Sequence, residues 1–145
     1  MKKYISEFIG TFVLVVFACG TAAVSGPKVL NGMFMPAYFA TAFAFGLSIV
    51  AMDYSIGNVS GCHVNPAVSL GVFLSGRMSG RDFIGYVIAQ FLGAIIGAAV
   101  LFALIGTKGN LGSNGLYLND VGASLTVEVI LTFVFVLAVL GVTSN

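Results

Sequence analysis

Charged residues are scarce in this sequence. Only 8% of its 145 residues are charged, whereas soluble domains carry roughly 25%. Because 59% of the residues are hydrophobic, the chain has too few polar side chains to form a surface solvated by water. We therefore expect the lipid bilayer to be its solvent. A formal net charge of +1 gives no basis for binding nucleic acid or an acidic partner.

Residues that build disulfides and metal centres are also scarce. There are two cysteines and one histidine. Both cysteines, Cys19 and Cys62, have apolar neighbours, which indicates small packed residues rather than a disulfide or a metal site. An intramembrane metal enzyme would have to use Glu7, Glu128 and His63, which come from separate segments without the close spacing of ligands. We therefore expect a protein that is not an enzyme and that binds no metal or cofactor. Metal found in the purified protein would favour the enzyme alternative instead.

Long apolar runs dominate what remains. Crossing the hydrocarbon core takes about 20 apolar residues, and four segments are long enough: residues 4–24, 36–56, 83–105 and 121–142. Breakers or polar residues mark the connections, at 25–28, 31–32, 75–77 and 106–120. The first run also resembles a signal peptide. Because Glu7 interrupts it and three more apolar segments follow, we expect it to remain as a span.

Residues 57–74 fit neither a span nor an ordinary loop. The first half is rich in glycine and is expected to be irregular, and the second half is apolar for only about ten residues, roughly 15 Å or half a bilayer. Asn65 followed by Pro66 forms a good helix start. We predict a re-entrant loop and then a half-helix. Irregular backbone at membrane depth is tolerated only inside protein or beside a watery cavity, so this segment indicates a pore or binding site.

The basic residues of the short connections are distributed unequally between the two sides of the membrane. Such residues concentrate on the cytoplasmic side. Four lie on the side of the N-terminus and two on the other, and an even number of spans returns the C-terminus to the first side. We therefore expect both termini in the cytoplasm. The two groups are Lys2, Lys3, Arg77 and Arg81, against Lys28 and Lys108.

The third span carries small residues at every fourth position. Small residues on one helix face let two backbones approach closely in a membrane. The stripe is therefore interpreted as a packing surface without a chemical role. It consists of Gly85, Ala89, Gly93 and Gly97.

The first and fourth spans resemble each other. Residues 7–15 and 128–136 are identical at six of nine positions, and each copy begins with a glutamate, Glu7 or Glu128. Three spans separate the two starts, so the second copy runs in the opposite sense, as in the inverted repeats of many transport proteins. We predict a single membrane domain that holds a first repeat at residues 1–106 and the opening helix of a second at 121–145. A second re-entrant loop would fall near position 186, beyond Asn145.

The half-helix segment carries a specific motif. Residues 60–68 read SGCHVNPAV, which resembles SGxHxNPAV, the first signature loop of the aquaporin and glycerol-facilitator family. Residues 6–11, 44–47 and 86–90 also fit the family pattern, and the resemblance covers the whole chain. It implies an all-α integral membrane fold of four transmembrane helices and one re-entrant half-helix, with an inverted repeat that is incomplete at the C-terminus.

The resemblance implies that this loop lines a pore. The Asn65 amide would donate to a passing water, while the positive end of the half-helix would repel cations. Phe45 resembles the aromatic member of the family's outer constriction and favours water over glycerol. The alternatives are a simple N-cap at Asn65, core packing of Phe45 and a satisfied buried His63. The pore-facing residues would be Gly61, Cys62, His63 and Val64 through their carbonyls, with Asn65, Pro66, Ala67 and Phe45.

The remaining roles also follow from the resemblance. Leu14, Ile49 and Phe135 would form the apolar pore wall. Acids are costly inside a bilayer and need a reason to be there, so Glu7 and Glu128 are expected to brace the two re-entrant loops by accepting backbone N–H bonds.

Two functions remain open at this stage. The first is a channel for passive flow of water, with glycerol and other small neutral solutes as further candidates, in a plasma-membrane homotetramer surrounded by lipid. The second is a truncated chain that folds without conducting, because a family pore needs two opposed half-helices.

Overall fold

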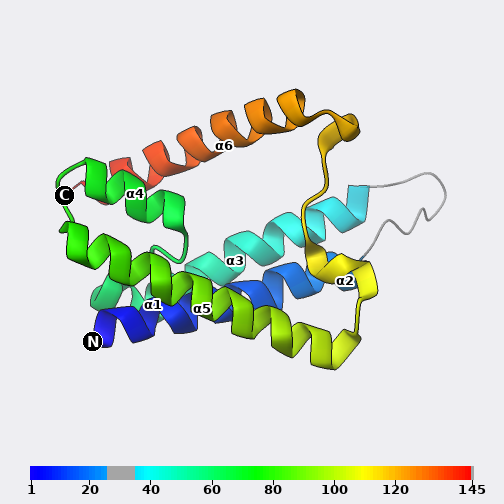
Figure 1. The fold of residues 1–145 in the computed structure, drawn as a ribbon, viewed down its shortest axis with the longest axis horizontal. Helices are drawn as coiled ribbons and strands as arrows, with labels where there is room; N and C mark the ends of the chain where they lie inside the picture. Colours follow the sequence, from blue (N-terminus) through cyan, green and yellow to red (C-terminus); the bar gives the residue numbers. More distant parts are fainter. Residues whose placement is uncertain (26–34, 145) are drawn as a thin grey trace.

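The structure, a computed structural model, describes residues 1–25 and 35–144, and these parts contain helices and no strand (Figure 1). A continuous first helical segment consists of α1, a π-helical turn η1 and α2. Two short 3₁₀ turns, η2 and η3, precede the last helix. The bounds are α1 Lys2–Leu14, η1 Val15–Cys19, α2 Gly20–Ser25, α3 Met35–Ser60, α4 Pro66–Leu74, α5 Gly80–Ile105, η2 Lys108–Gly112, η3 Tyr117–Asn119 and α6 Val121–Val142.

Four helical segments of the described chain are long and apolar enough to cross a membrane. They confirm the four predicted spans, and the fourth has the bounds that the sequence predicted. The predicted connections at residues 25–28 and 31–32, with Lys28, lie outside the described residues except for Ser25, which ends α2. The four segments are Lys2–Ser25, Ala37–Ser60, Gly80–Ile105 and Val121–Val142.

The second span ends later than predicted. Residues 57–60, expected to be irregular, form the last turn of α3, so that expectation was wrong. The N–H of Gly61 closes this turn with a 2.8 Å bond to the carbonyl of Gly57. Gly61 then takes φ +82, a left-handed value that glycine adopts without steric cost. Gly61 therefore ends α3, and Gly57 does not interrupt the helix.

Helix α4 begins as its sequence predicted. Asn65 is the N-cap, with an extended backbone (φ −153, ψ 125), and its Oδ1 accepts a 2.8 Å bond from the N–H of Ala67. Pro66 occupies the first helical position, where a missing N–H costs nothing. The helix has nine residues and is about 13.5 Å long, which is too short to cross a hydrocarbon core of about 30 Å.

Figure 1 shows the N-terminus, the C-terminus and the α4–α5 connection at one end of the molecule. The segment between α5 and α6 lies toward the other end. Helices α1 and α6 consequently run in opposite directions, as the three spans from one start to the other require. Lys2, Lys3, Arg77 and Arg81 belong to the first end, and Lys108 to the second.

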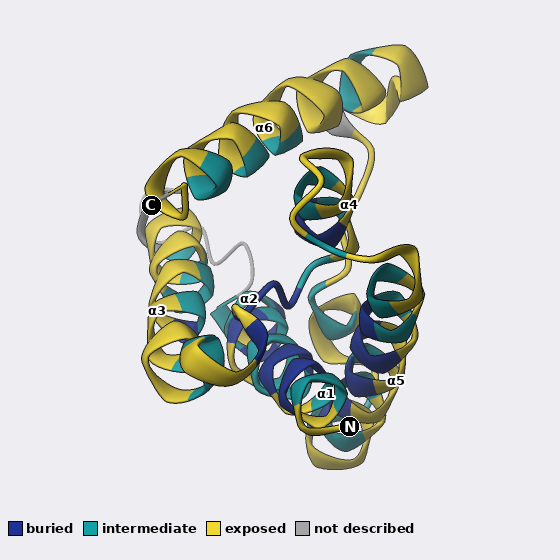
Figure 2. Cartoon of the chain, turned by 90° about the vertical axis from the view of Figure 1, so that its left-hand side faces the viewer, coloured by how far each residue is buried: buried dark blue, intermediate teal, exposed yellow. Residues whose placement is uncertain are grey.

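The most buried residues lie where α1, α5 and the loop before α4 meet (Figure 2). Glycines let α1 and α5 approach closely. A Cβ added to Gly93 would clash with the carbonyl oxygen of Phe8, and one on Gly97 would come within 3.0 Å of Val15 Cβ. Gly85 and Ala89 lie on the same helix, with Gly85 against the ring of Tyr4.

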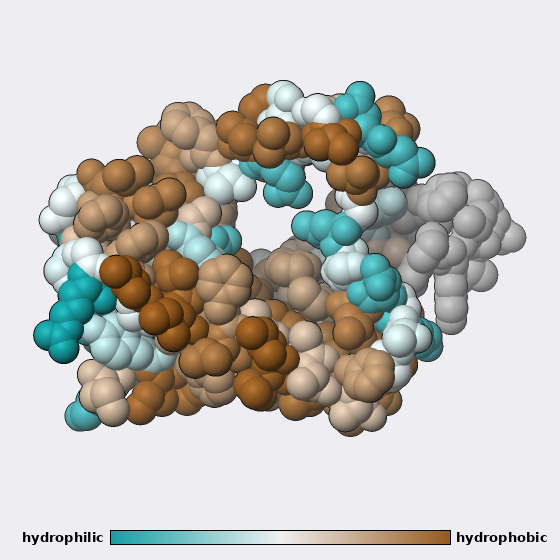
Figure 3. All heavy atoms as spheres, viewed as in Figure 1, coloured by the Kyte–Doolittle hydropathy of each residue, from teal (hydrophilic) through white to brown (hydrophobic). Residues whose placement is uncertain are grey.

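Helix α6 is packed loosely by comparison. None of its described residues is buried, and the space-filling view shows an opening between α6 and the rest of the chain (Figure 3). Hydrophilic residues border parts of that opening, while apolar residues cover most of the outer surface in this view, as expected for side chains that face lipid.

Candidate functional site

The carboxylate of Glu7 organises the loop between α3 and α4. It is fully buried and accepts four hydrogen bonds. Oε1 accepts from the Ser60 hydroxyl at 2.7 Å and from the N–H of His63 at 2.9 Å. Oε2 accepts from the N–H of Val64 and from Gln90 Nε2, both at 2.7 Å. A carboxylate offers about four acceptor positions, so the buried acid is satisfied.

These bonds fix the direction in which the loop carbonyls point. In a trans peptide the N–H and the C=O of the same peptide group point in opposite directions. Because the N–H groups of His63 and Val64 point at Glu7, the carbonyl oxygens of Cys62 and His63 point away from it. No residue in the described ranges donates a hydrogen bond to either oxygen. Left-handed φ values at Cys62 (+46) and Val64 (+42) produce this backbone path.

Helix α5 holds the start of the loop. The hydroxyl of Tyr86 donates to the carbonyl oxygen of Ser60 at 2.7 Å, and its ring lies 5.0 Å from the imidazole of His63 between centroids. The N–H of Cys62 donates to Ser60 Oγ at 3.2 Å. The end of α3 is therefore connected to both α1 and α5 by buried polar contacts.

A second set of contacts connects the loop to α4. His63 Nδ1 lies 3.0 Å from Ser69 Oγ, and Gln90 Nε2 donates to the same oxygen at 3.0 Å. All three side chains are buried. The imidazole thus has a fixed orientation between α4 and α5.

Asn65 stands where the loop becomes helix α4. Its Oδ1 is engaged by the N–H of Ala67, and no described residue accepts from its Nδ2. The side chain is half-buried, so Nδ2 remains a donor at the positive N-terminal end of a helix. The structure thus brings the motif residues 61–67 together as one unit with Glu7.

A cavity of about 170 Å³ adjoins this unit. The guanidinium of Arg77 crosses beside it and donates from Nη1 to the carbonyl oxygen of Thr143 at 2.7 Å and to Thr143 Oγ1 at 3.1 Å. The α4–α5 connection is therefore bonded to the end of α6. The cavity is lined by Gly61, His63, Val72, Arg77, Val139 and Thr143.

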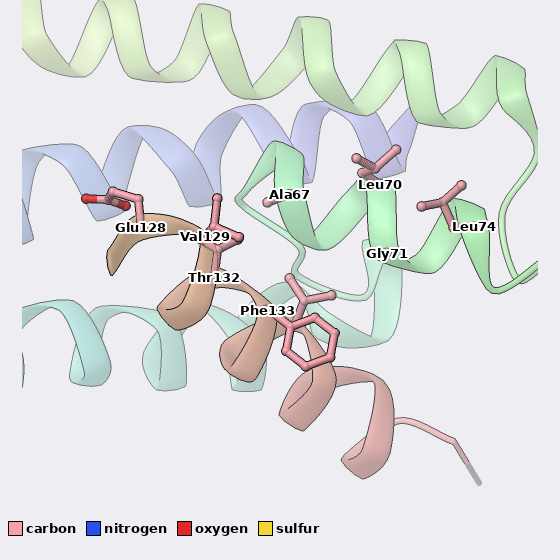
Figure 4. Close-up of a pocket in the computed structure, with 9 residues that line it drawn as sticks. Ala67, Leu70, Gly71, Leu74, Glu128, Val129, Thr132 and Phe133 are labelled. Atoms are coloured by element: carbon pink, nitrogen blue, oxygen red, sulfur yellow. The ribbon is translucent and has the colours of Figure 1, made fainter. Parts of the chain in front are cut away.

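Glu128 differs from Glu7 in its surroundings. It is exposed, and no hydrogen bond or ion pair joins it to any described residue. It borders an apolar pocket of about 420 Å³ between α4 and α6, on the side opposite Leu74 (Figure 4). The pocket is lined by Ala67, Leu70, Gly71, Leu74, Glu128, Val129, Thr132, Phe133 and Val136.

The predicted pore-wall residues are spread over three helices. Leu14 on α1 and Ile49 on α3 are half-buried, and Phe135 on α6 is 39% exposed. Phe45, predicted at the outer constriction, is half-buried on α3. No described hydrogen bond connects them with the motif loop.

Both cysteines are unpaired, Cys62 being buried and Cys19 half-buried. Residues 1–25 and 35–144 contain no group of three or more potential metal ligands.

The comparison with known proteins agrees with this geometry. The model of the major intrinsic protein family matches residues 1–145. The chain belongs to that family. It is 40% identical over 157 aligned positions to Aquaporin Z of Brucella melitensis, covering 100% of this chain and 67% of the relative. It is 39% identical to Aquaporin Z of Bradyrhizobium diazoefficiens (99% and 63% covered) and of Rhodopseudomonas palustris (98% and 62% covered).

Membership of the family settles the class of the protein. This major intrinsic protein is a multi-pass integral membrane protein of a channel family, and not of an enzyme family, as its sequence predicted. The chain spans between 62% and 67% of the length of these three relatives.

Sequence reasoning gave no role to several residues that the site uses. Tyr86 and Gln90 belonged to a family pattern without an assigned role, and Ser69 was given no role at all. Each is a polar side chain in an apolar helix, and that is the signal that would have marked them. Asp53 was also missed. It is an exposed acid inside the second span, with a carboxylate beside Gly57.

Proposed function

We propose that this protein is part of a channel for the passive flow of water across a membrane. The observation that carries the proposal is the direction of the Cys62 and His63 carbonyls, which follows from the bonds that Glu7 accepts. Two free acceptors in sequence, followed by the Asn65 donor, can replace the hydrogen bonds that a water loses on leaving bulk solvent. Non-helical backbone at this depth is tolerated where it lines such a path.

The same arrangement would exclude cations. The N-terminal end of a helix carries roughly half a positive charge, and α4 begins next to the loop. A neutral water pays no penalty in this field, whereas a cation is repelled. Helix ends of this kind are a recognised source of selectivity in aquaporin-type pores.

Two observations support water rather than glycerol as the main permeating molecule. The relatives bear the name Aquaporin Z, and Phe45 occupies the position whose aromatic ring is expected to narrow the path. Glycerol and other small neutral solutes remain candidates for slower passage.

The experiment is stopped-flow osmotic shrinkage of lipid vesicles that contain only this chain. Vesicles with the Asn65→Asp variant and empty vesicles are the comparisons. Asp and Asn cap helices about equally well, so the variant keeps the helix start and replaces a neutral donor by a negative charge. We expect fast shrinkage that the variant abolishes. Shrinkage no faster than in empty vesicles contradicts a pore formed by this chain.

The second candidate is a chain that folds without conducting. Two observations favour it: α6 has no buried residue, and an apolar pocket of about 420 Å³ lies between α6 and α4. Glu128 also forms no hydrogen bond or ion pair with any described residue. If the vesicles do not shrink while the loop remains folded around Glu7, this second candidate is the better description.

We further propose a homotetramer in the plasma membrane with both termini in the cytoplasm. The basic residues Lys2, Lys3, Arg77 and Arg81 at the end that carries the termini support this orientation. A Ser144→Cys variant tests it, since a membrane-impermeant thiol reagent should label that cysteine only after the cells are opened. Labelling in intact cells contradicts the orientation. Mass measurement of the detergent-free complex tests the tetramer.

A further inference from the structure

A chain of hydrogen bonds runs from Glu7 to His63 through two residues that the pore proposal does not use. Gln90 Nε2 donates to Glu7 Oε2 at 2.7 Å and to Ser69 Oγ at 3.0 Å. Ser69 Oγ lies 3.0 Å from His63 Nδ1. Because Gln90 is 1% exposed and Ser69 is fully buried, bulk water does not compete for these bonds.

Glu7 determines which atom donates and which accepts in each hydrogen bond of this series. The backbone N–H groups of His63 and Val64 can only donate, so both oxygens of Glu7 act as acceptors here. The atom of Gln90 beside it must therefore be the amide nitrogen. An amide nitrogen only donates, so Ser69 Oγ must accept from Gln90.

The hydroxyl hydrogen of Ser69 then needs an acceptor. Within the part of the chain that the structure describes, the other polar partner of Ser69 Oγ is His63 Nδ1. If Nδ1 accepts, the neutral imidazole carries its hydrogen on Nε2. The opposite tautomer would point an N–H at Ser69 Oγ and leave a buried hydroxyl hydrogen without a partner, which is unfavourable.

We propose that Ser69 is a positioning residue that holds His63 in the Nε2–H tautomer, so that the imidazole offers a hydrogen-bond donor to the cavity beside Gly61. A Cβ on Gly61 would lie 3.4 Å from Nε2 and 3.5 Å from Cδ2, so this edge of the ring faces Gly61. Both residues line the cavity of about 170 Å³, together with Arg77.

The role of the imidazole donor in the cavity rests on the proposed function. With an imidazole N–H and a guanidinium in its lining, the cavity suits small neutral molecules that offer an oxygen lone pair, and it disfavours cations. The tautomer itself is independent of conduction. A chain that does not conduct can still have the Nε2–H tautomer, so failure of one proposal is distinguishable from failure of the other.

The single histidine of the chain makes a direct test practical. The full chain is labelled with ¹⁵N-histidine and placed in lipid vesicles, and solid-state NMR identifies which ring nitrogen is protonated. We expect one tautomer, protonated at Nε2, in the wild type and in Ser69→Thr, which keeps the hydroxyl. We expect Ser69→Ala to lose this single state and show signal from Nδ1–H.

Two outcomes overturn the proposal. One is Nδ1–H as the main form in the wild type, which decides the question even where Ser69→Ala does not fold. The other is an unchanged, pure Nε2–H tautomer in Ser69→Ala whose backbone amide signals at His63 and Val64 remain those of the wild type. Those two amides report whether the loop is still bound to Glu7.

Discussion

The hydroxyl of Tyr86 donates a 2.7 Å hydrogen bond to the backbone carbonyl oxygen of Ser60, and both residues are buried. Ser60 is the last residue of α3, where carbonyl groups lose their partners within the helix. Helix α5 thus supplies the partner that the helix end lacks, and it fixes the point from which the motif loop starts.

Tyr86→Phe should destabilise the protein because it leaves that buried carbonyl unpaired. We expect the free energy of unfolding to fall by about 1–3 kcal/mol, the cost of an unsatisfied buried polar group. Steric trapping in bilayers or unfolding in mixed micelles measures it. Tyr54→Phe is the matched control, because Tyr54 is 89% exposed and should change stability by less than about 0.5 kcal/mol. An equal decrease in the free energy of unfolding in the two variants would contradict a stabilising role for the bond from Tyr86 to Ser60.

Glu7→Gln should be far more damaging than Glu128→Gln, although the two acids occupy equivalent positions of the sequence repeat. The glutamine side chain would direct an N–H₂ group at donors that now point at a carboxylate oxygen. We expect a loss on the order of 3–5 kcal/mol, because about two buried donors would lose their acceptor at about 1–3 kcal/mol each.

Glu128 has no bonded partner among the described residues, so its variant should stay within about 0.5 kcal/mol of the wild type. The same unfolding measurement compares the two variants. If Glu7→Gln also stays within about 0.5 kcal/mol of the wild type, the loop contacts of Glu7 contribute little to stability.

The sequence predicted the spans well because the signal is long and strong. Runs of about 20 apolar residues leave little choice of structure in a membrane, and the fourth span even has its predicted bounds. The start of α4 was also predicted correctly, since Asn65 and Pro66 determine it locally.

The end of α3 was predicted incorrectly because tertiary contacts decide it. Gly57, Asn58 and Ser60 suggest a loop by local preference, yet the bond that Ser60 donates to Glu7 and the bond that it accepts from Tyr86 hold it at the end of a helix. The π-helical turn at Val15–Cys19 had no sequence signal that we recognised. The chain of bonds through Gln90 and Ser69 joins residues 21 positions apart, which no local pattern reveals.

Gly93→Ala should separate α1 from α5. The added Cβ would clash with the carbonyl oxygen of Phe8, and a backbone atom cannot move aside as a flexible side chain can. We expect a loss of about 1–3 kcal/mol, the usual cost of overpacking. Gly141→Ala is the control, because nothing lies within 4 Å of its added Cβ. That variant should be neutral or stabilising by up to about 1 kcal/mol, since alanine favours a helix over glycine. Destabilisation by both variants to the same extent would refute close packing at Gly93.

Arg77→Met should loosen the end of α6 without affecting the core. Arg77 donates from Nη1 to the carbonyl oxygen and the hydroxyl oxygen of Thr143, the C-cap of α6. A cation at this position also interacts favourably with the negative end of the helix.

Because the contact is exposed, its loss should cost no more than about 1 kcal/mol, which corresponds to roughly fivefold faster amide hydrogen exchange. We expect that acceleration at residues 139–144 and unchanged exchange in α1. Arg81→Met is the control, since no described residue forms a hydrogen bond with the Arg81 side chain, and the exchange of this variant at 139–144 should match the wild type. If both variants exchange alike there, Arg77 does not anchor α6, and the wall of the cavity beside His63 must be held by the apolar contacts of Val72 and Val139 alone.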